Sequence, residues 1–113
     1  MKRKQATDSL AAYEQALNNL DKEHYILRLY VAGATLRSIQ AIASIKAFCE
    51  AHLHGRYDLE VIDIYQQPTL AQSEQIIVAP TLVKKRPLPP RKLVGDFTSV
   101  ERVLQALNLR RNM

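Results

Sequence analysis

The chain has 113 residues, of which 47% are hydrophobic and 24% are charged, and its formal net charge is +5. This length and composition predict one globular domain and exclude an intrinsically disordered chain, while the single cysteine excludes an intrachain disulfide. Charged residues interrupt the longest apolar runs every few positions, so we expect no membrane span and a soluble, cytoplasmic protein.

Residues 1–24 are polar and charged, and we interpret them as an N-terminal helical extension of a domain at 25–113. The helix is expected from Ser9 to Leu20, with Asp8 or Ser9 as its N-cap. Spacing of 3-4-3 gives it one apolar stripe, formed by Leu10, Tyr13, Leu17 and Leu20. A helix this short is marginal alone, so the stripe should dock on the domain or on a neighbouring subunit.

The pattern changes its period after the extension. Residues 25–31, YILRLYV, are rich in β-formers and nearly all apolar, as expected of a strand buried on both faces. Thr35 can cap a long helix that reaches about Leu53 and stops before Gly55. Residues 59–64 then predict a second strand. A strand, a long helix and another strand indicate a right-handed parallel crossover.

The second half predicts a short helix over 68–77, strands over 81–85 and 91–94, and a last helix. The segment 98–101, TSVE, matches a capping box at the start of that last helix. The predicted element order is therefore βαβαββα. This is the thioredoxin topology, and it places the protein in the α/β class.

Ala79, Pro80 and Thr81 match a second feature of thioredoxin-like proteins, in which a proline, usually cis, opens a central strand. We interpret these three residues as a recognition strand. A thioredoxin thiol follows the first strand, but residues 32–38, AGATLRS, contain no cysteine. Cys49 lies more than three turns further along the apolar stripe of the predicted helix, so we expect an inert core thiol.

Other catalytic patterns are equally weak. His52 and His54 point in different directions on a helix and cannot chelate one metal together. Asp63 lies in an apolar strand, but nothing near it in sequence supplies a nucleophile. Gly33 and Gly55 are isolated and make no phosphate-binding loop. We therefore predict no enzyme activity, no cofactor and no metal site.

Five cations and no acid lie within nine residues: Lys84, Lys85, Arg86, Arg91 and Lys92. Such a cluster fits a solvated loop, an acidic protein surface or the phosphates of a nucleic acid. The segment has no aromatic residue to stack on a base, and its prolines remove backbone donors. Nucleic acid is therefore disfavoured, while the loop and the acidic protein surface both remain open.

The run YILRLYVAGATLRSIQAI, followed by LEVIDIYQQPTLAQSEQIIVAPTLVKKRPLPPRKLVGDFTSVERVLQAL, closely resembles the KaiB family of cyanobacterial clock proteins, which has relatives in other bacteria. The resemblance extends over about residues 25–109. Its most specific parts are LYVAG at 29–33, the VID-containing region at 61–68, and the APTL to GD segment at 79–96. The same signature also resembles the sensor domain of the kinase SasA.

The resemblance implies a protein without catalysis that binds the ATPase ring of KaiC and, in cyanobacteria, helps to sequester KaiA and displace SasA. It also implies two folds, a resting tetramer of order βαββααβ and a thioredoxin-like monomer that binds KaiC. Such switching requires two packings within a few kcal/mol of each other. The implied partners are a KaiC-type ATPase and other copies of this chain, in a dimer or tetramer. An alternative function is a thioredoxin-like, stress-related binding protein or enzyme that acts without a clock ATPase.

Lys84, Arg91 and Lys92 stand at cationic partner-binding positions of the family. Other family charges are lost: an arginine, a lysine and an acidic-lysine segment are replaced here by Gln40, Glu60 and the segment 72–75, which ends in Gln75. A reversed charge at an interface changes the association rate and the choice of partner. The contact with KaiC is therefore expected to be re-tuned.

Ala106 and Asn108 occupy positions where much of the family has Gly and Asp. Ala stabilises a helix over Gly by roughly 1 kcal/mol, and removal of an acid near a helix C-terminus contributes about 0.5 kcal/mol. We expect both residues to favour a C-terminal helix and therefore the thioredoxin-like fold. A shift of about 1–1.5 kcal/mol changes a two-state ratio roughly tenfold.

Overall fold

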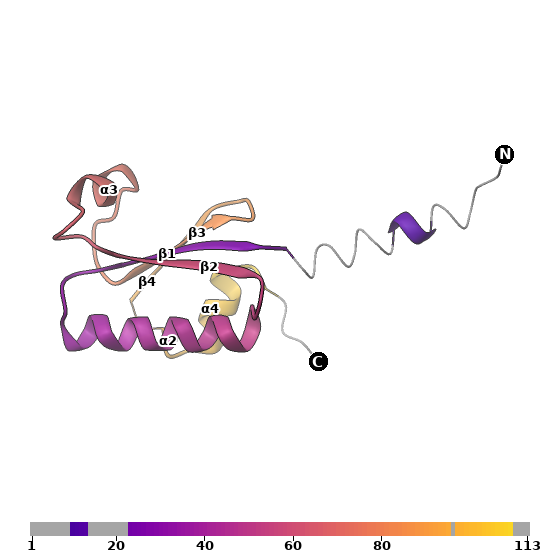
Figure 1. Cartoon of the computed structure of the whole chain (residues 1–113), viewed down its shortest axis with the longest axis horizontal. Coiled ribbons are helices and arrows are strands. Elements are labelled where there is room, and N and C mark those ends of the chain that lie inside the picture. Colours follow the sequence, from indigo (N-terminus) through magenta and orange to yellow (C-terminus); the bar gives the residue numbers. More distant parts are fainter. Residues whose placement is uncertain (1–9, 14–22, 96, 110–113) are drawn as a thin grey trace.

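A four-stranded sheet of order β2-β1-β3-β4 forms the centre of the computed structural model, which describes residues 10–13, 23–95 and 97–109 (Figure 1). β1 runs parallel to β2 and antiparallel to β3, and β4 is antiparallel to β3. The strands are β1 (Tyr25–Val31), β2 (Tyr57–Asp63), β3 (Thr81–Arg86) and β4 (Arg91–Val94). The helices are α2 (Leu36–His52), α3 (Pro68–Ser73) and α4 (Val100–Ala106). The element order βαβαββα and the parallel crossover predicted from the sequence are confirmed.

The two layers on the sheet differ in size. Helices α2 and α4 lie on one side of it, and α3 lies on the other (Figure 1). The larger core buries side chains of β1, α2 and α4, including Leu27, Leu29, Ile45, Cys49 and Val103. The smaller cluster lies under α3 and consists of Tyr30, Ile62, Ala71 and Val83. β1 and β3 supply residues to both clusters, so these two strands are shared by both layers.

The start of α2 forms as its sequence predicts. Thr35 has an extended backbone, and its hydroxyl oxygen accepts a hydrogen bond from the N–H of Ser38 at 3.1 Å. This bond satisfies one of the N–H groups that a helix start leaves without a partner. The helix ends at His52, and Gly55 turns the chain toward β2 with a φ of 75° that favours glycine.

Helices α3 and α4 end alike, each in a residue with a left-handed backbone. Gln75 has a φ of 58° and Asn108 a φ of 59°. After α4, the N–H of Asn108 donates to the carbonyl of Gln105 at 3.1 Å, and that of Leu109 donates to Leu104 at 2.8 Å. These paired bonds form a Schellman motif, and the same pair of bonds closes α3.

This geometry corrects the expected bounds of both helices. The predicted helix 68–77 stops at Ser73, because Gln75 leaves the helical region. Asn108 lies beyond α4, whose last residue is Ala106, so of the two residues expected to favour a C-terminal helix only Ala106 belongs to that helix. The predicted cap also shifts by one residue, because Ser99 accepts the N–H of Arg102 at 3.3 Å.

The predicted N-terminal helix is described only in part. Residues 10–13 are helical, and the rest of the predicted span from Ser9 to Leu20 lies outside the described residues. Leu10 and Tyr13 are exposed. Among the residues that the structure describes, no helix has both the length and the apolar character needed to cross a bilayer.

Replacement of Asn108 tests its role at the end of α4. Asn108→Ala should lower the free energy of unfolding by about 1 kcal/mol, because a Cβ-bearing residue without a polar side chain disfavours the left-handed region. Asn108→Gly should leave stability unchanged or raise it, and chemical denaturation measures both. Equal stability of the two variants would contradict the left-handed assignment.

Candidate partner-binding site

The loops at the carboxyl ends of β1 and β2 are joined by hydrogen bonds to Asp63. Asp63 accepts hydrogen bonds from the N–H of Gly33 at 3.1 Å and from the N–H of Tyr65 at 2.9 Å. Gly33 has a φ of 71°. The Asp63 carboxylate, considered above as a general base, therefore ties the two loops together.

The only cysteine lies away from these loops, in the interior. Cys49 is 0% exposed on the inner face of α2, which confirms the predicted core thiol. Burial, together with the charge of Glu50, raises the pKa of this thiol to about 12. The thiolate that redox exchange requires is therefore almost absent at neutral pH.

The recognition strand is held in place by its neighbours. The bond between Ala79 and Pro80 is cis, and Pro80 and Thr81 are buried. The carbonyl of Pro80 accepts the N–H of Gly95 at 3.1 Å, and the Thr81 hydroxyl donates to the carbonyl of Val78. Ala79 is only half-buried, so the part of this segment nearest to solvent is the stretch that leads into Pro80.

A cleft of about 310 Å³ opens beside Pro80. It lies between the first turns of α2 and the loop after β4, and its lining residues are Arg37, Gln40, Ala41, Ser44, Pro80, Gly95, Phe97 and Thr98. Gln40 is therefore placed next to the recognition strand. Among these lining residues, Arg37 carries the only charge.

The fold separates the basic residues that were predicted to form one site, and Lys84 does not lie on the surface. Its side chain is 1% exposed, and its Nζ donates to the carbonyl of Leu107 at 3.4 Å. Burial, with a smaller effect from the charge of Arg91, lowers the pKa of Lys84. Lys84 therefore cannot touch a partner in this arrangement, because β3 directs it beneath the end of α4.

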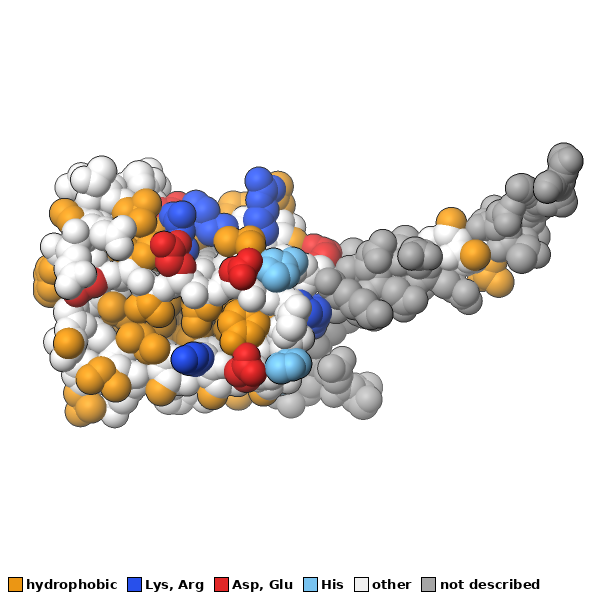
Figure 2. Space-filling model, in the orientation of Figure 1, with side chains coloured by type: hydrophobic (Ala, Val, Ile, Leu, Met, Phe, Trp, Pro, Cys, Tyr) orange, Lys and Arg blue, Asp and Glu red, His pale blue; other side chains and the backbone are white. Residues whose placement is uncertain are grey.

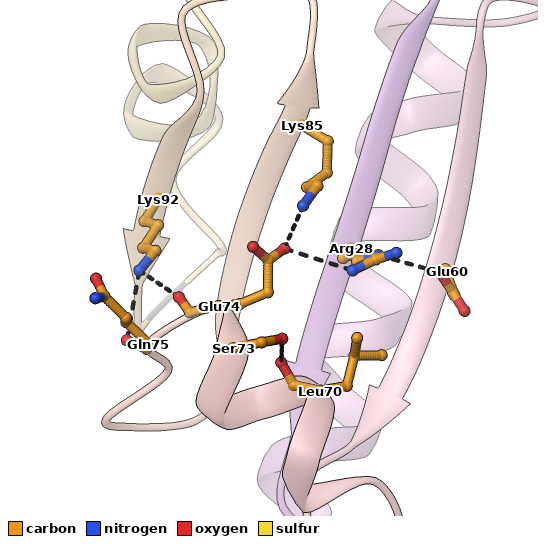
Figure 3. A network of polar contacts seen from close by, with 8 residues as sticks. All are labelled: Arg28, Glu60, Leu70, Ser73, Glu74, Gln75, Lys85 and Lys92. Carbon is orange, nitrogen blue, oxygen red and sulfur yellow. Dashed lines mark hydrogen bonds and ion pairs between the residues drawn. The ribbon is translucent and has the colours of Figure 1, made fainter.

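Lys85 and Lys92 both contact the turn that follows α3 (Figure 3). Lys85 Nζ lies 2.8 Å from the carboxylate of Glu74, which also pairs with Arg28 at 3.5 Å. Lys92 Nζ donates to the backbone carbonyl of Glu74 at 2.6 Å and to that of Gln75 at 3.4 Å. Lys92 is exposed, but part of its role is to hold this turn against β4.

Arg91 is exposed and forms neither an ion pair nor a side-chain hydrogen bond in the described part of the chain, whereas Lys92, which is also exposed, donates to two backbone carbonyls. It stands at the start of β4, opposite Lys84 of β3. The predicted surface of three cations is therefore reduced to Arg91, with Lys92 beside it in a mixed role.

Sequence reasoning missed the network centred on Glu74. Arg28 bridges Glu60 at 3.2 Å and Glu74 at 3.5 Å, so Glu60 pairs within the sheet. Burial alone would raise the pKa of Glu74, but the hydrogen bond from Lys85 and the charges of Lys85 and Arg28 together lower it. A signal existed, because Glu74 is the only acid between Asp63 and Asp96.

Comparison with known proteins confirms the family resemblance. The model of the KaiB domain matches residues 28–109. The circadian clock protein KaiB3 of Synechocystis sp. is 41% identical over 90 residues, which are 80% of this chain and 88% of that protein. The circadian clock oscillator protein KaiB of Picosynechococcus sp. is 45% identical over 91 residues, with the same two coverages.

Solved structures agree on the fold. The N-terminal domain of Synechococcus elongatus SasA superposes with a TM-score of 0.64 at 25% identity, over 80% of this chain and 90% of that domain. The germline thioredoxin Deadhead of Drosophila melanogaster superposes with a TM-score of 0.60 at 13% identity, over 88% of this chain and 91% of the thioredoxin. The second match establishes a thioredoxin-like fold and no more than that.

Removal of the Glu74 charge should loosen the turn after α3. At pH 7, Glu74→Gln should lower the free energy of unfolding by about 1–2 kcal/mol, because Lys85 and Arg28 lose a shared anion. The folded pKa of Glu74 is lowered, so this contribution is present above its ordinary pKa of 4.5 and disappears as the pH falls through the folded value. Urea denaturation over this pH range measures it.

Glu60→Gln is the matched control for that measurement. The Glu60 side chain is 59% exposed, so its pair with Arg28 is screened and should contribute less than about 0.5 kcal/mol. An equal loss in the two variants would show that Glu74 has no special role.

Replacement of Lys84 tests how the burial of its ammonium group affects stability. Lys84→Met should keep or raise stability at pH 7 by up to about 1 kcal/mol, since a methionine fills the same space without a desolvated charge. The folded pKa of Lys84 lies below 10.5, so the unfolded chain binds more protons and wild-type stability rises as the pH approaches that value. The advantage of Lys84→Met should therefore shrink as the pH rises through the folded pKa of Lys84 toward 10.5. A less stable Lys84→Met at pH 7 would contradict this account.

Proposed function

This chain belongs to the KaiB family, and on that premise we propose that it is a non-catalytic regulator that binds a KaiC-type ATPase in circadian timing or a related stress or timing pathway. The observation that carries the proposal is the family match over residues 28–109, in which the curated relatives are circadian clock proteins. The thioredoxin-like fold shared with the SasA N-terminal domain supports a role in recognition.

The structure weighs against the alternative of a thiol-based enzyme. Cys49 is fully buried and its pKa is raised to about 12, so it lacks both access and thiolate character. The residues that follow β1 carry no thiol that could replace it. A scaffold that keeps the recognition strand without this chemistry is suited to binding. Self-association, a second fold and a cytoplasmic location remain predictions from the resemblance and the sequence.

The contact with the ATPase is proposed to include Arg91, helped by Lys92, on an acidic surface of the partner. Arg91 is exposed and forms no ion pair in the part of the chain that the structure describes, so its charge is available to an incoming protein. Exposed interface charges mainly raise the association rate and make it depend on salt. Lys84 is left out of this contact because it is buried.

The test is a pull-down of the KaiC-type ATPase by the full chain, with ATP, with ADP and without nucleotide. Arg91→Glu should weaken association by about fivefold to tenfold at low salt, with a smaller effect at high salt. Lys46→Glu is the control, because Lys46 is also exposed but lies on α2, outside the predicted set. Failure of the wild-type chain to bind in any nucleotide state would refute the proposed partner, and equal affinity of Arg91→Glu and wild type would remove Arg91 from the contact.

A further inference from the structure

A band of apolar side chains follows the line where α2 meets β2, the edge strand of the sheet. We call this band the apolar strip, and its members are exposed or half-buried: Ile39, Ile42, Tyr57, Leu59 and Val61. Leu59 and Val61 pair with the core residues Leu27 and Leu29 of β1, so they point to the side of the sheet that α2 covers. The strip is therefore the solvent-facing margin of the larger core.

The strip is continuous because α2 and β2 run side by side. The hydroxyl of Tyr57 donates to the carboxylate of Glu50, which fixes one end of the strand against the last turns of the helix. Two strand residues advance about as far as four helix residues, roughly 6 Å. Val61, four residues along β2, therefore lies near Ile42, eight residues back along α2.

The charged groups beside the strip already have contacts within the chain. Figure 2 shows a band of hydrophobic side chains over α2 and β2, between two rows of charged and histidine side chains. The acids near the strip have these contacts: Glu60 with Arg28 at 3.2 Å, Asp58 with His24 at 2.8 Å, and Glu50 with His54 at 3.2 Å. The strip therefore offers a partner mainly apolar contact, as expected of an interaction surface.

The same chain carries a second apolar group that has no cover. Residues 10–13 are helical, and Leu10 and Tyr13 are 58% and 68% exposed. Side chains three positions apart lie on the same face of a helix, so these two form one apolar pair. We call residues 10–13 the N-terminal turn. It precedes residue 28, where the family match begins, so it is a feature of this chain outside the matched domain.

The point at which the chain enters the domain brings the turn within reach of a strip. The N–H of Tyr25 donates to the carbonyl of Arg56 at 2.8 Å, and Tyr25 pairs with Tyr57 at the end of the strip. Ten residues lead from Tyr13 to Glu23, and a chain of that length spans at most about 35 Å.

A second copy is the occupant that leaves neither apolar group exposed. Within one chain, both Tyr13 and Val61 are exposed, so the turn does not cover the strip of its own domain. Each chain has one turn and one strip. A two-fold pair of chains lets each turn cover the strip of the other copy, because the contacts of such a pair are reciprocal.

We propose that the N-terminal turn binds the apolar strip of a second copy of this chain, in a reciprocal two-fold dimer. Leu10 and Tyr13 of one copy cover Ile39 and Val61 of the other. Side chains of this size and exposure bury on the order of 1,000 Å² in the two contacts together, an area typical of weak association. We therefore expect a dimer with a dissociation constant on the order of 100 µM. Arg91 lies on the opposite edge strand, so this contact is independent of the proposed ATPase contact.

The test is sedimentation velocity of the full chain from about 5 to about 500 µM, over which the mean mass should rise from one chain toward two. Leu10→Ser/Tyr13→Ser and, separately, Ile39→Ser/Val61→Thr should each weaken dimerisation at least about tenfold, because each removes apolar contact area. Leu88→Ser is the matched control. Leu88 is also an exposed apolar residue, but it lies in the loop between β3 and β4.

A spin label identifies which copy the turn contacts. Cys49 is 0% exposed and its pKa is raised to about 12, so a thiol-reactive label attaches to an introduced Ala11→Cys in preference to it. The labelled chain is mixed with an ¹⁵N-enriched wild-type chain, and only the second chain gives NMR signals. The amide signals of residues 59–61 should broaden in the wild-type chain.

Four outcomes would overturn the proposal. The first is the mass of a single chain throughout the concentration range. The second is unchanged association of Leu10→Ser/Tyr13→Ser, which would assign self-association to another surface, and the third is an equal loss in Leu88→Ser. The fourth is broadening at residues 59–61 only within the chain that carries the label, which would place the turn on its own domain. No ATPase is present, so this test and the pull-down can fail independently.

Discussion

The arrangement of the domain depends on the partners that β1 has in the middle of the sheet, for its backbone and for its one charged side chain. Both edges of this strand are paired, with β2 and with β3, and most of its side chains are buried. Arg28 is its only charged residue, and a guanidinium in such a place needs carboxylate partners. Glu60 supplies one from β2 and Glu74 supplies the other from the turn after α3. The ion pair between Arg28 and Glu74 therefore also holds α3 over the face of the sheet that carries the smaller cluster.

This constraint continues into the segment before β3. Glu74 shares its carboxylate with Lys85, while its backbone carbonyl is held by Lys92 of β4. The turn is thus attached to β1, β3 and β4 at once, as Figure 3 shows. Its attachment leaves residues 76–80 with little freedom, although they form no regular structure. The exposed apolar residues of this segment are therefore presented by a fixed backbone.

The elements of the fold could be predicted from the sequence because each rests on a local pattern. The β-rich run at 25–31, the cap at Thr35 and the glycine at 55 each act within a few residues, and the structure confirms all three. The burial of Cys49 followed from helical spacing in the same way.

The errors concern properties that depend on distant contacts. Lys84 was assigned to a partner-binding surface because it stands at a cationic position of the family, but β3 lies between β1 and β4 and turns that side chain toward the carbonyl of Leu107. Asn108 was expected to favour a C-terminal helix, but it lies beyond α4 in a left-handed turn, and Leu109 packs on the core from beyond the helix. The network of Glu74 with Arg28 joins residues 46 positions apart, and the isolation of Glu74 among neutral and basic residues does not identify its partner.

The placement of charge and apolar surface around β4 limits how a partner could engage this domain. Arg91 begins the strand, and the cleft residue Gly95 directly follows its last residue, Val94. A four-residue strand is only about 10 Å long, so one partner surface of ordinary size could reach both features along β4. That strand is an edge of the sheet, but its short length and its two exposed cations disfavour pairing with another copy. A partner that approaches this edge would therefore be guided by Arg91, because exposed charges act mainly on the association rate.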